Sequence, residues 1–249
     1  KFMDHILLLF PFEKKYFEKE SINCTFVGHP AAKHKNLDSG EPFRIKYHLS
    51  DSTVLGVFPG SRVSEVQRML PVFTETVRLL KTTIPNLHIL ITIVSNTKYI
   101  VEKYVNKYSV PVTLVENKMD KLAAFQACNV ALATSGTITT ELAAVGTPMV
   151  VGYKMAPITM AIARHLVKVP HITLINLVLG KEVVPEFIQG RCTPVALAGA
   201  LRTLITDSHA RSLQIDGLKD AIHLLGGNGI DPAQRAAKVV ETVINKACC

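Results

Sequence analysis

A four-residue loop, Pro59, Gly60, Ser61 and Arg62, has the residue types of an anion-binding turn. An apolar stretch precedes the loop and a long amphipathic stretch follows it, so we expect it between a strand and a helix. Glycine lets a ligand approach the backbone, a helix N-terminus favours an anion, and an arginine can donate two parallel hydrogen bonds to a phosphate. The same residues would also form a tight turn with a solvated Arg62, so the loop alone leaves both interpretations open.

A second loop, Thr134, Ser135, Gly136 and Thr137, is also expected between a strand and a helix. Ser135 and Thr137 can cap that helix and leave backbone N–H groups for a diphosphate. Glu141 follows on the first turns of the helix, where a carboxylate can accept hydrogen bonds from the vicinal hydroxyls of a ribose. The alternative is an ordinary N-cap with an acidic residue that the helix dipole favours.

Three polar residues, Asn176, Glu186 and Gln189, lie in an otherwise apolar segment. Such groups suit the orientation of a sugar in a pocket. A buried Asn176 that satisfies a loop explains the pattern equally well. The chain has neither a Gly-x-Gly-x-x-Gly sequence nor a Walker-type phosphate loop, which disfavours a standard dinucleotide fold and a P-loop enzyme.

The elements that must position these residues alternate regularly from residue 53 onward. Strands are expected at residues 54–58, 87–94, 112–115, 130–133 and 148–152, and helices at 63–82, 98–108, 120–128, 138–145 and 157–167. This alternation predicts βαβ units, and near-continuously apolar strands predict a parallel sheet that helices cover on both faces. The expected fold class is therefore α/β with a Rossmann-like parallel sheet. Ligands bind beyond the carboxyl ends of the strands in such folds, which is where the first two loops lie.

The two ends of the chain differ from this middle region. Strands are expected at residues 5–10 and 24–27 with a helix at 14–20, and the polar stretch 31–52 is expected to be a linker or a domain boundary. After Pro194 only helices are expected, with breaks near Asp207 and at residues 226–229. The chain does not begin with Met, which is consistent with a fragment of a longer protein.

The net charge of +8 favours anionic partners such as nucleotide phosphates or anionic lipid. The basic residues are scattered and the chain has no Trp, so nucleic acid is not an expected partner. Five cysteines without a CxxC pair suit a reducing cytoplasm and argue against a disulfide scaffold or a zinc site. No metal is expected, and no apolar run approaches the roughly 18 residues that span a bilayer.

Taken in order along the chain, the motifs resemble those of the lipid-A-disaccharide synthase family. The match extends from Phe10 to Gln189, and its strength lies in the order and spacing of segments that are weak individually. These segments are Pro11-Phe12-Glu13, Val27-Gly28-His29-Pro30, Pro59-Gly60-Ser61-Arg62 with Glu65, Ser135-Gly136-Thr137 with Glu141, Pro148-Met149-Val150-Val151-Gly152-Tyr153-Lys154, Leu166-Val167-Lys168, Asn176-Leu177 and Val184-Pro185-Glu186 with Gln189.

The resemblance implies the donor-binding half of a GT-B glycosyltransferase, an enzyme of two Rossmann-like halves with the active site between them. The family transfers 2,3-diacylglucosamine from its UDP donor to 2,3-diacylglucosamine 1-phosphate, a lipid X-type acceptor, and releases UDP. No cofactor is implied. Residues 1–52 would be a remnant of the N-terminal acceptor domain plus a linker, and residues 53–249 the UDP-sugar-binding domain with C-terminal helices.

The resemblance also assigns site residues. Gly60, Ser61 and Arg62, together with the Ser135, Gly136 and Thr137 loop, would hold the diphosphate, and Glu141 the ribose. Asn176, Glu186 and Gln189 would lie near the donor sugar or diphosphate. No catalytic residue is assigned, because the family's proposed catalytic carboxylate lies in an N-terminal half that has no counterpart here beyond residues 1–30. Ile175 departs from the Pro that the family usually has before the matching Asn.

Acylated substrates imply a cytoplasmic enzyme that acts peripherally on the inner membrane of a Gram-negative-type bacterium. The stretch 154–168 is the candidate contact with the membrane surface, since apolar and basic residues recur there at helical spacing. A sheet-covering helix with its apolar side in the core is the alternative interpretation. A homodimer is left open.

Two other functions are also compatible with the sequence. One is another GT-B enzyme that uses UDP-N-acetylglucosamine, such as a muramyl-lipid transferase or a 2-epimerase, against which residues 11–13 and 27–30 argue. The other is a non-catalytic module that binds nucleotide sugars.

Overall fold

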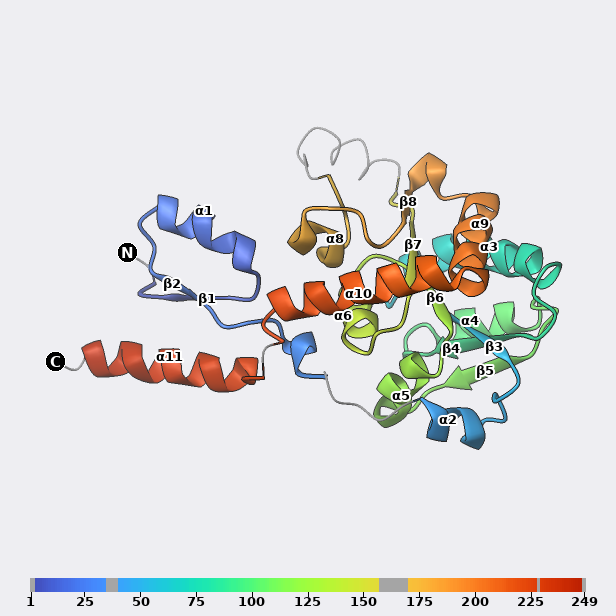
Figure 1. Cartoon of the computed structure of the whole chain (residues 1–249), viewed down its shortest axis with the longest axis horizontal. Coiled ribbons are helices and arrows are strands. Elements are labelled where there is room, and N and C mark those ends of the chain that lie inside the picture. Colours follow the sequence, from blue (N-terminus) through green and yellow to red (C-terminus); the bar gives the residue numbers. More distant parts are fainter. Residues whose placement is uncertain (1–2, 35–39, 157–169, 228, 248–249) are drawn as a thin grey trace.

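The computed structural model describes residues 3–34, 40–156, 170–227 and 229–247 (Figure 1). In these residues, six strands form one parallel sheet in the order β5-β4-β3-β6-β7-β8. The strands are β3 (Thr53–Phe58), β4 (Leu87–Thr92), β5 (Val112–Val115), β6 (Val130–Ala133), β7 (Met149–Tyr153) and β8 (Glu186–Ile188). The chain builds outward from β3 to β5 and then returns to place β6 beside β3, so the strand order reverses between these two strands.

Helices cover both faces of this sheet because alternate strand residues enter two separate cores. Leu55 and Val57 belong to the core under α3 (Val63–Lys81), α4 (Lys98–Val105) and α9 (Pro194–Thr206). Val54 and Phe58 belong to the core on the other face, under α5 (Lys121–Gln126), α6 (Thr137–Ala144), α8 (Leu174–Leu179) and α10 (Ser208–Leu224). Each fully buried aliphatic or aromatic side chain contributes roughly 1.5–3 kcal/mol. The expected α/β fold, with a parallel sheet that helices cover on both faces, is therefore confirmed.

In the described part of residues 31–52, the stretch expected as a linker, two short helices are packed onto the domain. These are η2 (Pro30–His34) and α2 (Glu41–Lys46). Phe43 is buried in the sheet core. The guanidinium of Arg44 donates to the carbonyl oxygens of Ala127 at 2.7 Å and Ser52 at 2.7 Å. The described part of this polar stretch is therefore not a free linker, because Phe43 and Arg44 attach it to the domain.

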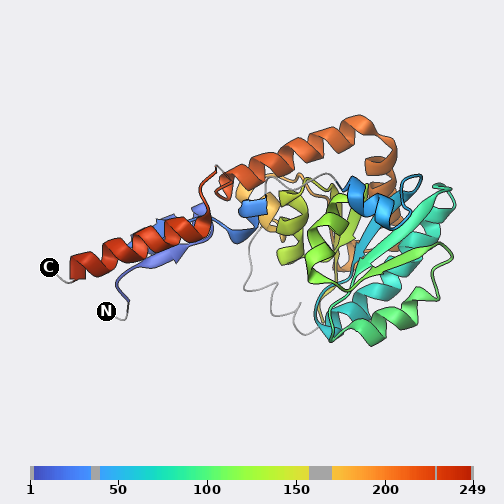
Figure 2. The same cartoon turned by 90° about the horizontal axis from the view of Figure 1, so that it is seen from below.

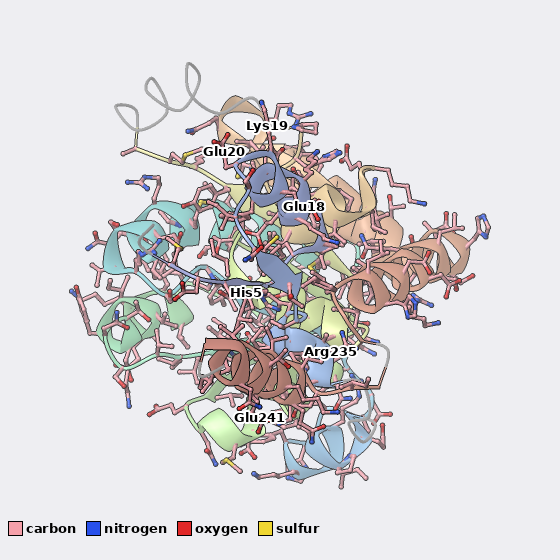
Figure 3. The ribbon with its side chains drawn as sticks, turned by 90° about the vertical axis from the view of Figure 1, so that its left-hand side faces the viewer. His5, Glu18, Lys19, Glu20, Arg235 and Glu241 are labelled. Atoms are coloured by element: carbon pink, nitrogen blue, oxygen red, sulfur yellow. The ribbon has the colours of Figure 1, made fainter. Side chains whose placement is uncertain are left out.

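The two ends of the chain lie close together, away from the main sheet (Figure 2). Strand β1 (Ile6–Leu8) pairs in parallel with β2 (Cys24–Phe26), and η1 (Pro11–Glu13) and α1 (Lys14–Lys19) connect them. Helix α11 (Pro232–Ala247) lies on the other side of this small sheet from α1. Figure 3 shows His5 between Glu18 of α1 and Glu241 of α11, and a groove of about 750 Å³ separates the sheet from α11.

The expected helix at 157–167 and most of the candidate membrane contact, including Ile158, Ile162, Arg164, Leu166 and Lys168, lie outside the described residues. Within the described residues, no helix is both long enough and apolar enough to cross a membrane.

Candidate nucleotide-binding site

The two predicted loops meet where the strand order of the sheet reverses. The backbone N–H of Thr134, just after β6, donates to the carbonyl oxygen of Phe58 at the end of β3, at 3.0 Å. Connections at such a switch point leave the sheet toward opposite faces, which opens a crevice beyond the strand ends. A cavity of about 220 Å³ occupies this position. Its lining includes Pro59, Gly60, Ser61, Glu65, Thr92, Val94, Lys121, Ser135, Gly136, Thr137 and Glu141.

The loop after β3 is shaped by one glycine and one buried carboxylate. Gly60 has φ +115°, and a Cβ at this position would clash with the carboxylate of Glu65. Glu65 is buried on the first turn of α3 and accepts a hydrogen bond from the backbone N–H of Ser61 at 3.3 Å. Arg62 precedes α3, is exposed, and has no ion-pair partner within the described part of the chain. Its guanidinium is therefore available to an anion.

The loop after β6 ends in a helix whose first turn has no side-chain cap. We expected Ser135 and Thr137 to cap α6, and this was wrong: the N-cap is Gly136, and no side chain accepts from the first N–H groups. The hydroxyl of Ser135 instead donates to the carbonyl oxygen of Ile172 at 2.9 Å. An uncapped helix N-terminus is a site for an anion because its N–H groups point outward and the helix dipole favours negative charge.

Glu141 faces the same cavity with a partner that sequence reasoning missed. The ammonium of Lys121 donates to both carboxylate oxygens of Glu141, at 2.9 and 2.7 Å. Lys121 begins α5 and Glu141 lies on α6, so no spacing along the sequence could have indicated the pair.

Asn176 and Glu186 are buried and form one hydrogen-bonded network. The amide of Asn176 donates to Val184 O at 2.8 Å and to Glu186 at 2.7 Å, and it accepts from the N–H groups of Val183 and Val184. An asparagine amide has two donors and two acceptor positions, so Asn176 is saturated. Of the two interpretations left open, this geometry favours the residue that satisfies a loop.

Glu186 ties the same network to the neighbouring loop. Its carboxylate accepts from the backbone N–H groups of Ile172 and Thr173, each at 2.9 Å, and from the Thr173 hydroxyl at 2.6 Å. Because Ile172 also accepts from Ser135, Glu186 holds the segment that supports the loop after β6. Ile175, the departure from the family pattern, is buried in the core beneath α8.

Gln189 has two energetically unfavourable features. Its backbone has φ +53°, a left-handed conformation that non-glycine residues rarely adopt. Its side-chain Nε2 is buried and has no hydrogen-bond partner. Strained backbone and unpaired buried donors gather at functional sites. Gln189 follows β8, at the edge of the sheet, and does not line the cavity between the two loops.

His29, in the Val27-Gly28-His29-Pro30 motif, is buried and does not line the cavity, but its imidazole lies near enough to Glu141 to be affected by its charge. Its imidazole Nδ1 accepts from the backbone N–H of Ala31 at 3.2 Å, and the backbone N–H of His29 donates to Leu225 O at 2.8 Å. Burial lowers the pKa of the imidazole, and the nearby charge of Glu141 opposes this shift. The motif contributes to the family resemblance, but the sequence predicts no role for His29.

The family model described as lipid-A-disaccharide synthetase matches residues 1–240. The chain belongs to the lipid-A-disaccharide synthetase family. The synthase of Rhodospirillum centenum is 40% identical over 248 residues, which cover 99% of this chain and 62% of that protein. The synthase of Granulibacter bethesdensis is 35% identical, covering 96% of this chain and 65% of that protein. The chain thus spans less than two thirds of the length of these relatives.

Solved structures share the fold at low sequence identity. HepE from Anabaena, in complex with UDP and glucose, has a TM-score of 0.55 and 15% identity, covering 97% of this chain and 63% of that one. A putative UDP-N-acetylglucosamine 2-epimerase from Listeria monocytogenes has a TM-score of 0.59 and 12% identity, covering 86% and 54%. The Rossmann-like architecture expected of a GT-B half is confirmed. Family membership decides in favour of the lipid-A-disaccharide synthases over the other enzymes that the motifs left open.

Proposed function

We propose that this chain is the donor-binding half of a lipid-A-disaccharide synthase, which transfers 2,3-diacylglucosamine from UDP to 2,3-diacylglucosamine 1-phosphate. Family membership supports the reaction class. The observation that carries the assignment is the cavity at the switch point, where the uncapped N-terminus of α6 meets the loop that bears the unpaired Arg62. Together they offer a diphosphate backbone N–H groups, a helix dipole and a guanidinium.

The remaining residues have separate roles in this proposal. Glu141 accepts hydrogen bonds from the ribose hydroxyls, and Gln189 offers its unpaired amide to the donor sugar or diphosphate. Asn176 and Glu186 act indirectly by holding the segment beside Ser135.

The chemical contribution of this half is to position the donor and stabilise the leaving group. As the acceptor hydroxyl attacks the anomeric carbon, the bond to UDP breaks and negative charge develops on the diphosphate. Donors that already point at that charge stabilise the transition state without reorganisation. No residue of this half is assigned the proton transfer, so transfer requires the part of the relatives that this chain does not cover.

The location follows from the proposed substrates. Acyl chains hold donor and acceptor in a bilayer, so the reaction would take place at the cytoplasmic surface of the inner membrane. The net charge of +8 suits an anionic surface. Flotation of the chain with anionic vesicles at low and high salt tests this electrostatic contact. Vesicle binding that does not weaken at high salt would contradict it.

Calorimetric titration with UDP tests the donor site. The chain should bind UDP, and Arg62→Ala should weaken binding about tenfold or more, the loss expected for a hydrogen bond to a charged group. Arg78→Ala is the matched control, because Arg78 is an exposed arginine of α3 that pairs with Glu75. A folded chain that does not bind UDP, or equal effects of the two substitutions, contradicts the proposal.

A non-catalytic module that binds nucleotide sugars is the second candidate, since the geometry describes a binding cavity and no residue is assigned the proton transfer. A transfer assay distinguishes the two functions. Formation of product by the chain alone would exclude a non-catalytic module. If the chain binds UDP without transfer, and transfer appears when the remaining half of the enzyme is added, the proposed donor-binding role is supported.

A further inference from the structure

The Lys121–Glu141 pair places opposite charges together on the wall of the proposed nucleotide cavity. Both residues line the cavity, and both remain partly accessible, with side-chain exposures of 37% for Lys121 and 22% for Glu141. The ammonium contacts the two carboxylate oxygens almost equally, at 2.9 and 2.7 Å. This two-point contact fixes the direction in which the carboxylate faces.

Neighbouring contacts hold Lys121 toward the cavity. Its ammonium lies 5.5 Å from the ring centroid of Phe125, which is fully buried one turn further along α5. The preceding Asp120 is bound by Lys46 on α2, at 3.0 Å, rather than by Lys121. Lys121 is therefore free to pair with Glu141 across the gap between α5 and α6.

Lys121 and Glu141 do not use all their hydrogen-bond donors and acceptors on each other, so some remain for a ligand. An ammonium has three donors, and a carboxylate has about four acceptor positions. Lys121 uses two donors on Glu141 and takes one position on each oxygen. One N–H and at least one acceptor position per carboxylate oxygen remain, side by side. A vicinal diol, with two O–H donors and accepting oxygens, complements this arrangement.

We propose that Lys121 is a positioning residue that makes the site selective for ribonucleotides over 2′-deoxyribonucleotides. It holds the Glu141 carboxylate so that one oxygen accepts from each ribose hydroxyl, and its remaining N–H donates to an oxygen of the same sugar. The inference rests on the proposed function, because it requires a uridine nucleotide in this cavity. It extends that function by assigning a sugar-selecting role to a residue of α5.

An alternative explanation is that Lys121 attracts the diphosphate by its charge alone, and this explanation predicts a different pattern of affinities. Removal of a nearby positive charge would then weaken every phosphate-containing ligand by a similar factor. Selectivity for the sugar instead appears only when ligands with and without the 2′-hydroxyl are compared. Inorganic diphosphate, which has no sugar, separates the two explanations.

Calorimetry with UDP, 2′-deoxy-UDP and inorganic diphosphate on the unmodified chain, Lys121→Met and Lys121→Arg tests the proposal. The unmodified chain should prefer UDP to 2′-deoxy-UDP by about tenfold, the value of one hydrogen bond to a charged group. Lys121→Met should reduce this preference to about twofold or less while diphosphate affinity changes by less than about threefold. Lys121→Arg should restore the preference, since arginine can also contact both oxygens.

Lys46→Met is the control, because it removes one positive charge from the adjacent pair with Asp120, outside the cavity. It should leave the preference for UDP unchanged. If the unmodified chain does not bind UDP, the proposed function fails. If it binds UDP but Lys121→Met keeps the preference, or weakens all three ligands equally, only the role of Lys121 is overturned.

Discussion

The hydroxyl of Tyr153 donates a hydrogen bond of 3.0 Å to the Oε1 atom of Glu65, although the two residues are 88 positions apart. The other carboxylate oxygen of Glu65 accepts from the backbone N–H of Ser61. Burial, together with the charge of Glu65, raises the pKa of the Tyr153 phenol, so the hydroxyl keeps its proton at neutral pH. The end of β7 thereby sets the shape of the loop that follows β3.

Tyr153→Phe should loosen the loop that follows β3 without creating a cavity in the core. The ring remains, but Glu65 loses one donor, and we expect UDP affinity to fall about three- to tenfold. Calorimetry measures the effect, and Tyr99→Phe, which alters an exposed tyrosine on α4, is the control. Unchanged affinity in Tyr153→Phe would mean that Gly60 and the hydrogen bond from Ser61 to Glu65 suffice to hold the loop.

Asn176→Ala should destabilise the fold strongly. The substitution removes an amide that is fully buried and leaves the N–H groups of Val183 and Val184 and the carbonyl of Val184 without their partner. We expect the free energy of unfolding to fall by about 2–4 kcal/mol, measured in urea. Asn106→Ala, at an exposed position after α4, should change it by less than about 0.5 kcal/mol. Similar small losses in both variants would contradict a supporting network around Glu186.

His29 should make stability depend on pH. Burial holds its folded-state pKa below the ordinary value of 6.5, so the unfolded chain binds more protons than the folded chain just below that pH. The free energy of unfolding should therefore decrease as pH falls from 6.5 toward the folded-state pKa.

Titration of the His29 ring by NMR should give a midpoint below 6.5. Since the negative charge of Glu141 raises this pKa, Glu141→Gln should lower the midpoint further, and Glu116→Gln, at an exposed position after β5, should not. If the titration midpoint of His29 is the same in Glu141→Gln as in the unmodified chain, the charge of Glu141 does not act on His29.

The cysteines should differ in reactivity according to burial. Burial raises the pKa of the Cys128 thiol to about 12 and also raises the pKa of Cys192, whereas Cys24 is only half-buried. In a Cys248→Ser, Cys249→Ser variant at pH 8, a disulfide reagent should modify Cys24 first, because the thiolate is the reactive form. Cys128 and Cys192 should react only when the chain unfolds in guanidinium. Two or more thiols reacting rapidly in the native protein would contradict the packing around β3 and β7.

The sequence alone predicted five of the six strands of the described main sheet and the order in which they follow one another along the chain. Strands at 112–115 and 130–133 have the expected bounds, since buried parallel strands are continuous apolar runs between turn residues. The break at Asp207 coincides with an N-cap, where its carboxylate accepts from the N–H groups of His209 and Ala210. Because parallel strands place their carboxyl ends at one edge, the same pattern also predicted that the loops bearing Arg62 and Gly136 lie near the ligand site.

Only the tertiary structure decided which polar groups are free and which are occupied. The short elements α2, α8 and β8 were not predicted, because they depend on contacts with residues distant in the chain, such as that of Arg44 with Ala127 and that of Glu186 with Thr173. Ser135 was expected to cap its own helix and instead bonds to Ile172. Lys121 meets Glu141 only because two helices are packed side by side. Local sequence specifies backbone conformation over a few residues, whereas hydrogen-bond partners far apart along the chain are specified by how the helices and strands pack.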